Sequence, residues 1–228
     1  MSSDIAVAVL VVAKAPVPGL AKTRLAATLG TAVAADLAAA ALLDTLDSVA
    51  DAPVAHRVVA MTGDLAAASR CEEIRTRLAD FTVVEQRGDD FADRLANAHA
   101  DAASAAGGLP VVQIGMDTPQ VTAALLAECA VALLSTDAVL GMARDGGWWV
   151  LGLTDPQAAE CLRTVPMSTA QTGAVTLAAL RDTGLDVQLL PELADVDTVD
   201  DIEEVRRMCA PDSRFRQASV AVEVGRAG

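Results

Sequence analysis

The sequence predicts one α/β domain, a mostly parallel β-sheet with helices on both faces. Two observations support this fold class. Short apolar runs alternate with helix-like segments up to about residue 134, and the 228 residues contain neither an internal repeat nor a linker. Alternating strands and helices form βαβ units, in which each helix returns the chain across the sheet so that the strands run parallel. A chain of this length can bury a sizeable core, so we expect residues 1–228 to form a single domain.

Hydrophobic periodicity places the elements of the first part. The apolar run at residues 5–12 is the first expected strand, and an Ala-rich helix is expected at residues 31–49, where apolar side chains recur at helical spacing. Further strands are expected at residues 56–63, 81–86 and 110–117, and further helices at residues 65–80, 91–106 and 122–134.

The last third is less regular and predicts a mixed sheet. Strands are expected at residues 138–144, 148–153 and 187–193, and helices at residues 170–182 and from Thr198. The segment after about residue 211 fits a loose tail, although “SVAVEV” also alternates like an edge strand.

The chain is strongly acidic. Its formal net charge of -14 argues against nucleic acid or an anionic membrane as a partner, because both need a basic surface. No apolar run approaches the roughly 18 residues that a membrane span needs. The first run follows Asp4 rather than the basic segment of a signal peptide, so we expect a cytoplasmic protein.

The stretch “VAKAPVPGLAKTRL” gathers positive charge directly after the first strand. Loops at the carboxyl ends of parallel strands are where α/β proteins bind ligands. The loop lacks the Gly-Lys pair of a P-loop. Even so, Gly19 lets the backbone approach a ligand, and Lys22 and Arg24 can bind a polyphosphate. A solvated basic turn is the alternative.

Aspartates follow two other expected strands. Asp117 ends the strand at residues 110–117, on the same edge as the basic loop, and Asp195 and Asp197 precede an expected helix. Proteins bind Mg²⁺ through one or two carboxylates together with phosphate oxygens, so these residues could form such a site. Taken one at a time, each aspartate is more typical of a turn or a helix cap.

Five motifs give the chain a resemblance to a known family. They are “PVPGLAKTRL”, “QIGMDTPQ”, “LGMARDGGWWVLGL”, “MSTAQT” and “LADVDTVDDI”. In them the chain resembles the glycosyltransferase-like proteins called selenodomain-associated transferases, of the glycosyltransferase-A superfamily. It is also similar to the phosphoenolpyruvate or phospholactate guanylyltransferases. The resemblance implies the three-layer sandwich of nucleotide-diphospho-sugar transferases, with a mixed, mostly parallel sheet.

The resemblance also implies which residues form the site. The residues expected to be catalytic are Lys22, Arg24 and Asp117. Nucleotide contacts are expected from Ala13, Pro18, Gly19, Lys22, Arg24, Gln86 and Arg94. The acceptor is expected to contact Asp145, Gly146, Gly147, Ser168 and Thr169, and Mg²⁺ or Mn²⁺ to bind Asp117 and Asp197. Arg94 could instead form a structural ion pair, and Ser168 or Thr169 could instead cap the following helix.

The chain departs from the family pattern near the expected acceptor pocket. Met142 stands in place of a proline, Trp148 and Trp149 in place of a Tyr-containing pair, and Met167 in place of a Trp. The two tryptophans are neighbours in a strand, so at most one of them can face a given pocket.

These observations predict a transferase. In a magnesium-dependent nucleotidyltransferase, an oxygen of a small anionic acceptor attacks the α-phosphorus of a nucleoside triphosphate and pyrophosphate leaves. An anionic acceptor is expected because a helix N-terminus follows Ser168 and Thr169. One alternative is a glycosyltransferase that uses a nucleoside diphosphate sugar, although Gly115-Met116-Asp117 replaces its usual Asp-x-Asp. The other is a non-catalytic nucleotide-binding protein with the same fold.

Overall fold

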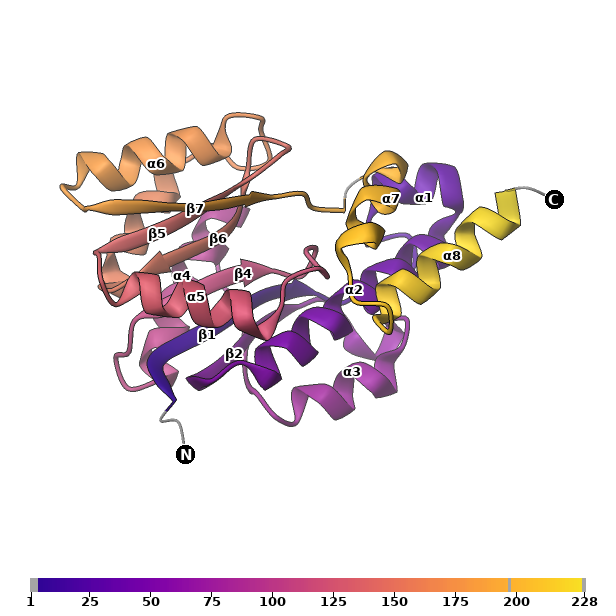
Figure 1. Ribbon diagram of the computed structural model, residues 1–228, viewed down its shortest axis with the longest axis horizontal. Helices are drawn as coiled ribbons and strands as arrows, with labels where there is room; N and C mark the ends of the chain where they lie inside the picture. The colour runs from indigo at the N-terminus through magenta and orange to yellow at the C-terminus, as the bar shows by residue number, and fades with distance from the viewer. Residues whose placement is uncertain (1–3, 197, 227–228) are drawn as a thin grey trace.

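The computed structural model describes residues 4–196 and 198–226. Within these residues, seven strands form one sheet in the order β3-β2-β1-β4-β6-β5-β7 (Figure 1). The strands are β1 (Ile5–Lys14), β2 (Val54–Thr62), β3 (Thr82–Glu85), β4 (Val111–Gly115), β5 (Ala138–Ala143), β6 (Trp148–Leu153) and β7 (Val187–Leu193). Only β6 runs antiparallel to its neighbours β4 and β5 among these strands, which confirms the predicted mixed, mostly parallel sheet.

Helices cover both faces of the sheet. They are α1 (Thr23–Leu29), α2 (Thr31–Asp51), α3 (Cys71–Leu78), α4 (Phe91–Ala105), α5 (Ala123–Leu133), α6 (Thr172–Asp182), α7 (Val199–Met208) and α8 (Arg214–Arg226), with the 3-10 helices η1 (Leu65–Ala67) and η2 (Pro156–Thr164). None of the described helices is both long and apolar enough to cross a membrane.

The two faces of the sheet carry separate cores, because neighbouring residues of a strand point to opposite sides. Val9 and Val11 of β1 pack with residues of α2, α3 and α5. Leu10 packs with residues of α4, η2 and α6 on the other face. The structure therefore has the three layers that the sequence predicts.

A third core lies beyond the carboxyl end of β1, where α1, α7 and α8 gather against α2 (Figure 1). Phe215 of α8 is fully buried there. The Asp44 carboxylate of α2 accepts hydrogen bonds from the backbone N–H groups of Arg214 (2.9 Å) and Phe215 (2.8 Å). Burial raises the pKa of Asp44, and these two bonds oppose that shift. Both expectations for the segment after residue 211 are therefore wrong, since it forms a helix fixed to α2.

The helix expected at residues 65–80 is interrupted. The chain forms η1, turns, and enters α3 only at Cys71. Arg70 adopts a left-handed conformation with φ 52°. Its guanidinium binds both carboxylate oxygens of Asp36 in α2, and the N–H of Ser69 donates to the carbonyl of Pro16. Tertiary contacts with the opening loop and with α2 thus override the local helical pattern.

Candidate functional site

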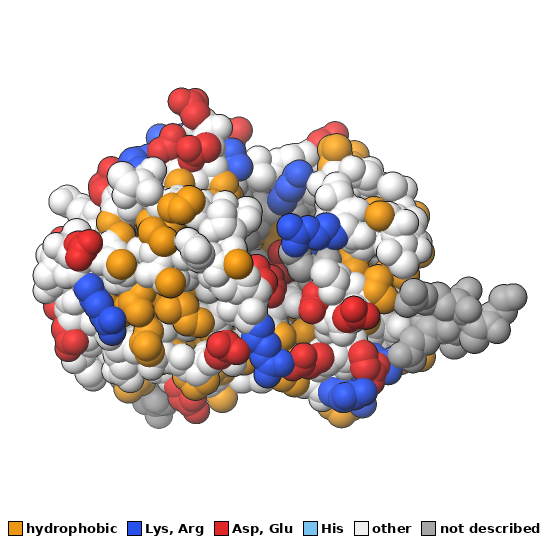
Figure 2. All heavy atoms as spheres, turned by 90° about the horizontal axis from the view of Figure 1, so that it is seen from above, with side chains coloured by type: hydrophobic (Ala, Val, Ile, Leu, Met, Phe, Trp, Pro, Cys, Tyr) orange, Lys and Arg blue, Asp and Glu red, His pale blue; other side chains and the backbone are white. Residues whose placement is uncertain are grey.

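Two adjoining cavities open at the carboxyl ends of β1 and β4. The main cavity has a volume of about 410 Å³, and the smaller one has a volume of about 280 Å³. They share Lys14, Met116 and Asp117 in their walls. Figure 2 shows this side of the molecule hollowed between its two halves, with Lys and Arg side chains at the edge of the hollow and acidic ones further in.

The opening loop lines the smaller cavity. Lys22 precedes α1 as its N-cap residue, in a left-handed conformation with φ 46°, and its Nζ lies 2.9 Å from Oδ2 of Asp117. The Lys22 side chain is only 9% exposed, and the Asp117 side chain is 38% exposed. Arg24 lines the same cavity. The structure thus brings together the basic loop and the strand-end aspartate, as the sequence predicts.

The remaining residues of the loop have different positions. Ala13 lines the main cavity, whereas neither Pro18 nor Gly19 is among the described residues that line the two cavities. Gly19 has φ 83°, in a turn where the N–H of Leu20 donates to the carbonyl of Val17. Gly19 therefore shapes the turn, and its contact with a ligand stays a prediction.

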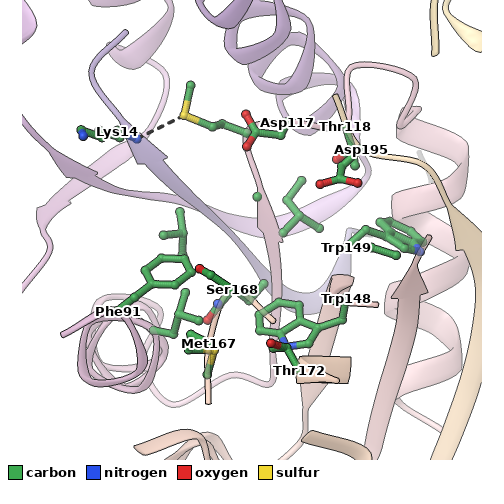
Figure 3. Close-up of a pocket in the computed structure, with 18 of the residues that line it drawn as sticks. Lys14, Phe91, Asp117, Thr118, Trp148, Trp149, Met167, Ser168, Thr172 and Asp195 are labelled. Carbon is green, nitrogen blue, oxygen red and sulfur yellow. Dashed lines mark hydrogen bonds between the residues drawn. The ribbon is translucent and has the colours of Figure 1, made fainter. Parts of the chain in front are cut away.

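A second carboxylate faces the main cavity. Asp195 lines it, while Asp197, predicted as a metal ligand, lies outside the described residues. The N–H of Val196 donates to the backbone carbonyl of Asp117 (3.2 Å). Figure 3 shows Asp117, Thr118 and Asp195 on one side of the cavity.

The donor set fits a metal ion that the protein and its ligand hold jointly. Across the described residues, no group of three or more His, Cys, Asp or Glu side chains could hold a metal ion. Asp117 and Asp195 instead offer carboxylate oxygens to one cavity. Mg²⁺ sites of this kind take one or two carboxylates and complete their coordination with phosphate oxygens and water.

Gln86 and Arg94 both line the main cavity. The Gln86 amide donates hydrogen bonds to the carbonyls of Ala13 (2.8 Å) and Ala60 (2.9 Å). These bonds use both of its N–H donors, so only its oxygen is left for a ligand. The Arg94 guanidinium lies 5.7 Å from the centre of the Phe91 ring. The alternative of a structural ion pair is not observed for Arg94, since no Asp or Glu in the described chain pairs with it.

In the turn between β5 and β6, the backbone amides expected to be free for a ligand are already hydrogen-bonded. Asp145 and Gly147 line the main cavity, but the backbone amides of both predicted glycines are already bonded. The N–H of Gly146 donates to the carbonyl of Ala143 (3.0 Å), and the N–H of Gly147 donates to Oδ1 of Asp145 (2.7 Å). A Cβ atom on Gly146 would lie 2.1 Å from the carbonyl oxygen of Ala170. Close packing, rather than free amides, accounts for this glycine.

The segment before α6 contributes Ser168 and Thr169 to the cavity wall. The Thr169 hydroxyl accepts from the N–H of Gln171 (3.3 Å), so it serves the turn into α6. The Ser168 hydroxyl makes no hydrogen bond within the described residues, and Ser168 has φ 58°. A non-glycine residue in this conformation is strained, and such strain is concentrated at functional sites. The acceptor contact of Ser168 therefore stays a prediction, and its position in the cavity wall is compatible with it.

Trp148 and Trp149 point to opposite faces of the sheet. Trp149 belongs to the core under α2 and α5, and its Nε1 donates to the carbonyl of Pro191 (2.9 Å). Trp148 packs on the other core. Both tryptophans nevertheless line the main cavity (Figure 3), so the prediction that at most one of them faces a given pocket is wrong. Several lining residues were not predicted, namely Lys14, Phe91, Leu95, Gln113 and Thr118. Strand alternation alone could have placed Gln113 on the side of α4.

Residues 45–169 match the family described as “Uncharacterized protein conserved in bacteria (DUF2064)”, and the chain belongs to this family. A crystal structure from Desulfovibrio desulfuricans G20, provisionally described as a nucleotide-diphospho-sugar transferase, is similar over the whole fold. It is 27% identical, with a TM-score of 0.82, and the match covers 100% of this chain and 96% of that chain. The likeness confirms the predicted fold class and agrees with the prediction of a transferase.

Two more distant structures share the fold. One is a CMP:2-keto-3-deoxy-manno-octonic acid synthetase complexed with CTP, with 11% identity, a TM-score of 0.56 and coverage of 89% of this chain and 97% of that chain. The other is Rv0371C of Mycobacterium tuberculosis H37Rv in complex with manganese. It has 20% identity and a TM-score of 0.53, and the match covers 87% of this chain and 97% of that chain. No curated protein sequence matches the chain.

Proposed function

We propose that this protein is a nucleotidyltransferase that moves a nucleotidyl group from a nucleoside triphosphate to a small anionic acceptor. The observation that carries the proposal is the contact of 2.9 Å between Lys22 Nζ and Asp117 Oδ2, at the junction of the two cavities. Lysine side chains bind phosphate and aspartate side chains bind metal ions, and this contact brings one of each together at the carboxyl ends of the parallel strands, where α/β proteins bind ligands.

The residues have separate roles in this reaction. Lys22 and Arg24 bind the triphosphate, for which Lys22 leaves Asp117 and turns to a phosphate oxygen. Asp117 and Asp195 would hold a divalent cation, which would supply neutralisation of the charge on the phosphates. Ser168 orients the acceptor so that its oxygen lies in line with the α-phosphorus. Catalysis then rests on positioning and charge neutralisation and needs no protein nucleophile.

The similar structures support this proposal without deciding the acceptor. The one that contains CTP is a synthetase named for CMP and a sugar acid, and another contains manganese. Sugar transfer from a nucleoside diphosphate sugar is the second candidate, which the description of the Desulfovibrio structure favours. Two features favour nucleotidyl transfer. Gly115-Met116-Asp117 has a single Asp in place of the Asp-x-Asp of sugar transferases, and a basic loop follows the first strand.

The products of the reaction separate the two candidates. Release of pyrophosphate and release of nucleoside diphosphate are measured in parallel, with the four ribonucleoside triphosphates, several nucleotide sugars and a panel of acceptors. Acceptor-dependent pyrophosphate release is the expected result. Acceptor-dependent release of nucleoside diphosphate would establish sugar transfer, and binding without either product would indicate a non-catalytic protein.

A further inference from the structure

The main cavity contains an apolar pocket that the proposed roles leave unused. Its walls are Phe91 and Leu95 of α4, Trp148 of β6, and Met167 of the segment before α6. Figure 3 shows Phe91, Met167 and Trp148 grouped near Ser168 and Thr172, away from Asp117 and Asp195. The cavity thus has a charged part and an apolar part.

These walls present apolar surface to a ligand. Trp148 and Met167 are partly buried against the core on the α4 side of the sheet, and Leu95 belongs to that core. Phe91 is 41% exposed although it is a large hydrophobic residue. Met167 is a flexible side chain that can adjust to the shape of a ligand.

Two buried N–H donors in the cavity wall have no acceptor within the described residues. They are Nε1 of Trp148 and Nε2 of Gln113. The oxygen of the Gln113 amide is already in use, because it lies 3.2 Å from Nδ1 of the buried His99. Burying an N–H donor without a partner costs free energy, so an acceptor atom of a ligand that reaches either donor would remove that cost.

We propose that the apolar pocket binds the body of the acceptor substrate, and that this body is apolar and carries a carbonyl or ether oxygen beside its anionic group. This inference rests on the proposed function, which puts the acceptor on the Ser168 side of the cavity. Apolar walls with donors fit an oxo acid of this kind. A sugar ring fits poorly, since its hydroxyl donors would be buried against apolar side chains.

Binding of simple probes to the full chain tests the proposal. Benzoylformate and 4-methyl-2-oxopentanoate each join an apolar body to a keto group and a carboxylate, and glucuronate is the matched polyhydroxylated carboxylate. Calorimetry should show that at least one oxo acid binds about tenfold or more tightly than glucuronate. Equal or weaker binding of both oxo acids would overturn the proposal.

Substitution of Trp148 assigns the binding to this pocket. Trp148→Phe keeps an aromatic ring but removes the N–H, so oxo-acid affinity should fall roughly 3- to 10-fold, the range for one hydrogen bond. If Trp148→Phe does not fold, Gln113→Leu replaces it, and this variant should lower the affinity for the oxo acid by a similar factor. Phe81→Leu is the control, because Phe81 packs against the opposite core and is not among the described residues that line the two cavities. Unchanged affinity in both pocket variants would overturn the proposal.

Titration of the same samples with ATP, CTP, GTP and UTP plus Mg²⁺ separates this inference from the proposed function. If a triphosphate binds and neither oxo acid exceeds glucuronate, the proposed function stands and the apolar subsite is wrong. If an oxo acid binds and no triphosphate does, the subsite stands and the proposed function fails. If Trp148→Phe weakens the triphosphate rather than the oxo acid, the pocket belongs to the nucleotide and the inference is overturned.

Discussion

The two halves of the main cavity are built in different ways. The half with Asp117 follows directly from the ends of the neighbouring parallel strands β1 and β4, together with the loop that carries Lys22. The half with Ser168 depends on packing between the β5–β6 turn and the start of α6, where Gly146 touches Ala170. The half with Asp117, called the charged half, therefore follows from sheet topology. The half with Ser168 is called the acceptor half because the proposed function assigns the acceptor to it, and it follows from side-chain and backbone packing that a sequence pattern does not encode.

The largest effect is expected in the charged half. Asp117→Asn keeps the shape of the side chain but removes the charge that offsets a cation. Because a bound metal contributes several kcal/mol to charge stabilisation, turnover should fall about 100-fold or more, and nucleotide affinity should lose its dependence on Mg²⁺. Asp182→Asn, at an exposed position at the end of α6, is the matched control. Wild-type metal dependence in Asp117→Asn would reassign this residue to a turn.

The buried His99, whose Nδ1 lies 3.2 Å from the amide oxygen of the cavity-lining Gln113, should make the stability of the protein sensitive to acid. His99 is fully buried, and burial lowers its pKa to about 4 from 6.5. The unfolded chain therefore takes up a proton below about pH 6.5 that the folded chain accepts only near pH 4. The contribution of His99 to the free energy of unfolding is fully present above pH 6.5. It falls by about 3 kcal/mol as the pH drops to 4.

Urea unfolding at several pH values measures this loss. His99→Asn lacks the titrating ring, so its stability should change less between pH 7 and pH 4 than that of the wild type. Other acidic groups contribute to both proteins, and the difference between the two curves isolates His99. Parallel curves would show that the pKa of His99 is the same in the folded and the unfolded chain.

A smaller loss is expected where the acceptor half depends on close packing. In Gly146→Ala the new Cβ would lie 2.1 Å from the carbonyl oxygen of Ala170, and the residue has φ 90°. Gly184 has a similar φ of 86° with no atom within 4 Å of the added Cβ, so Gly184→Ala measures the backbone strain alone. Gly146→Ala should cost about 2 kcal/mol, and more than the control. Equal melting temperatures for the two variants would show that the turn is not packed as described.

The smallest effect concerns Ser168. Removing its hydroxyl in Ser168→Ala should lower turnover with the acceptor about fivefold, as expected for one hydrogen bond of about 1 kcal/mol. Nucleotide affinity should stay unchanged because the proposed function assigns the hydroxyl to the acceptor alone. Ser104→Ala, on the exposed end of α4, is the control. A lower melting temperature with normal turnover would instead make Ser168 a structural residue of the turn before α6.

The sequence predicts the sheet and the charged half well for physical reasons. Apolar runs at strand length identify β1 and β4, and parallel topology then brings Lys22 and Asp117 to one edge. It predicts less of the acceptor half, because the bonded amide of Gly146 and the unpaired donor of Trp148 depend on tertiary contacts. The same limit explains α8, since its docking through Asp44 and Phe215 involves residues far apart in the sequence.

The central claim is that the opening loop binds a triphosphate beside Asp117. Its most direct test is the affinity for nucleoside triphosphates plus Mg²⁺, measured by calorimetry for the wild type, Lys22→Ala and the exposed control Arg181→Ala. A hydrogen bond to a charged group contributes about 1.5–3 kcal/mol, so Lys22→Ala should remain folded but bind the triphosphate roughly 10- to 150-fold more weakly. Arg181→Ala should bind as the wild type does. Equal affinity of Lys22→Ala and the wild type would contradict the account.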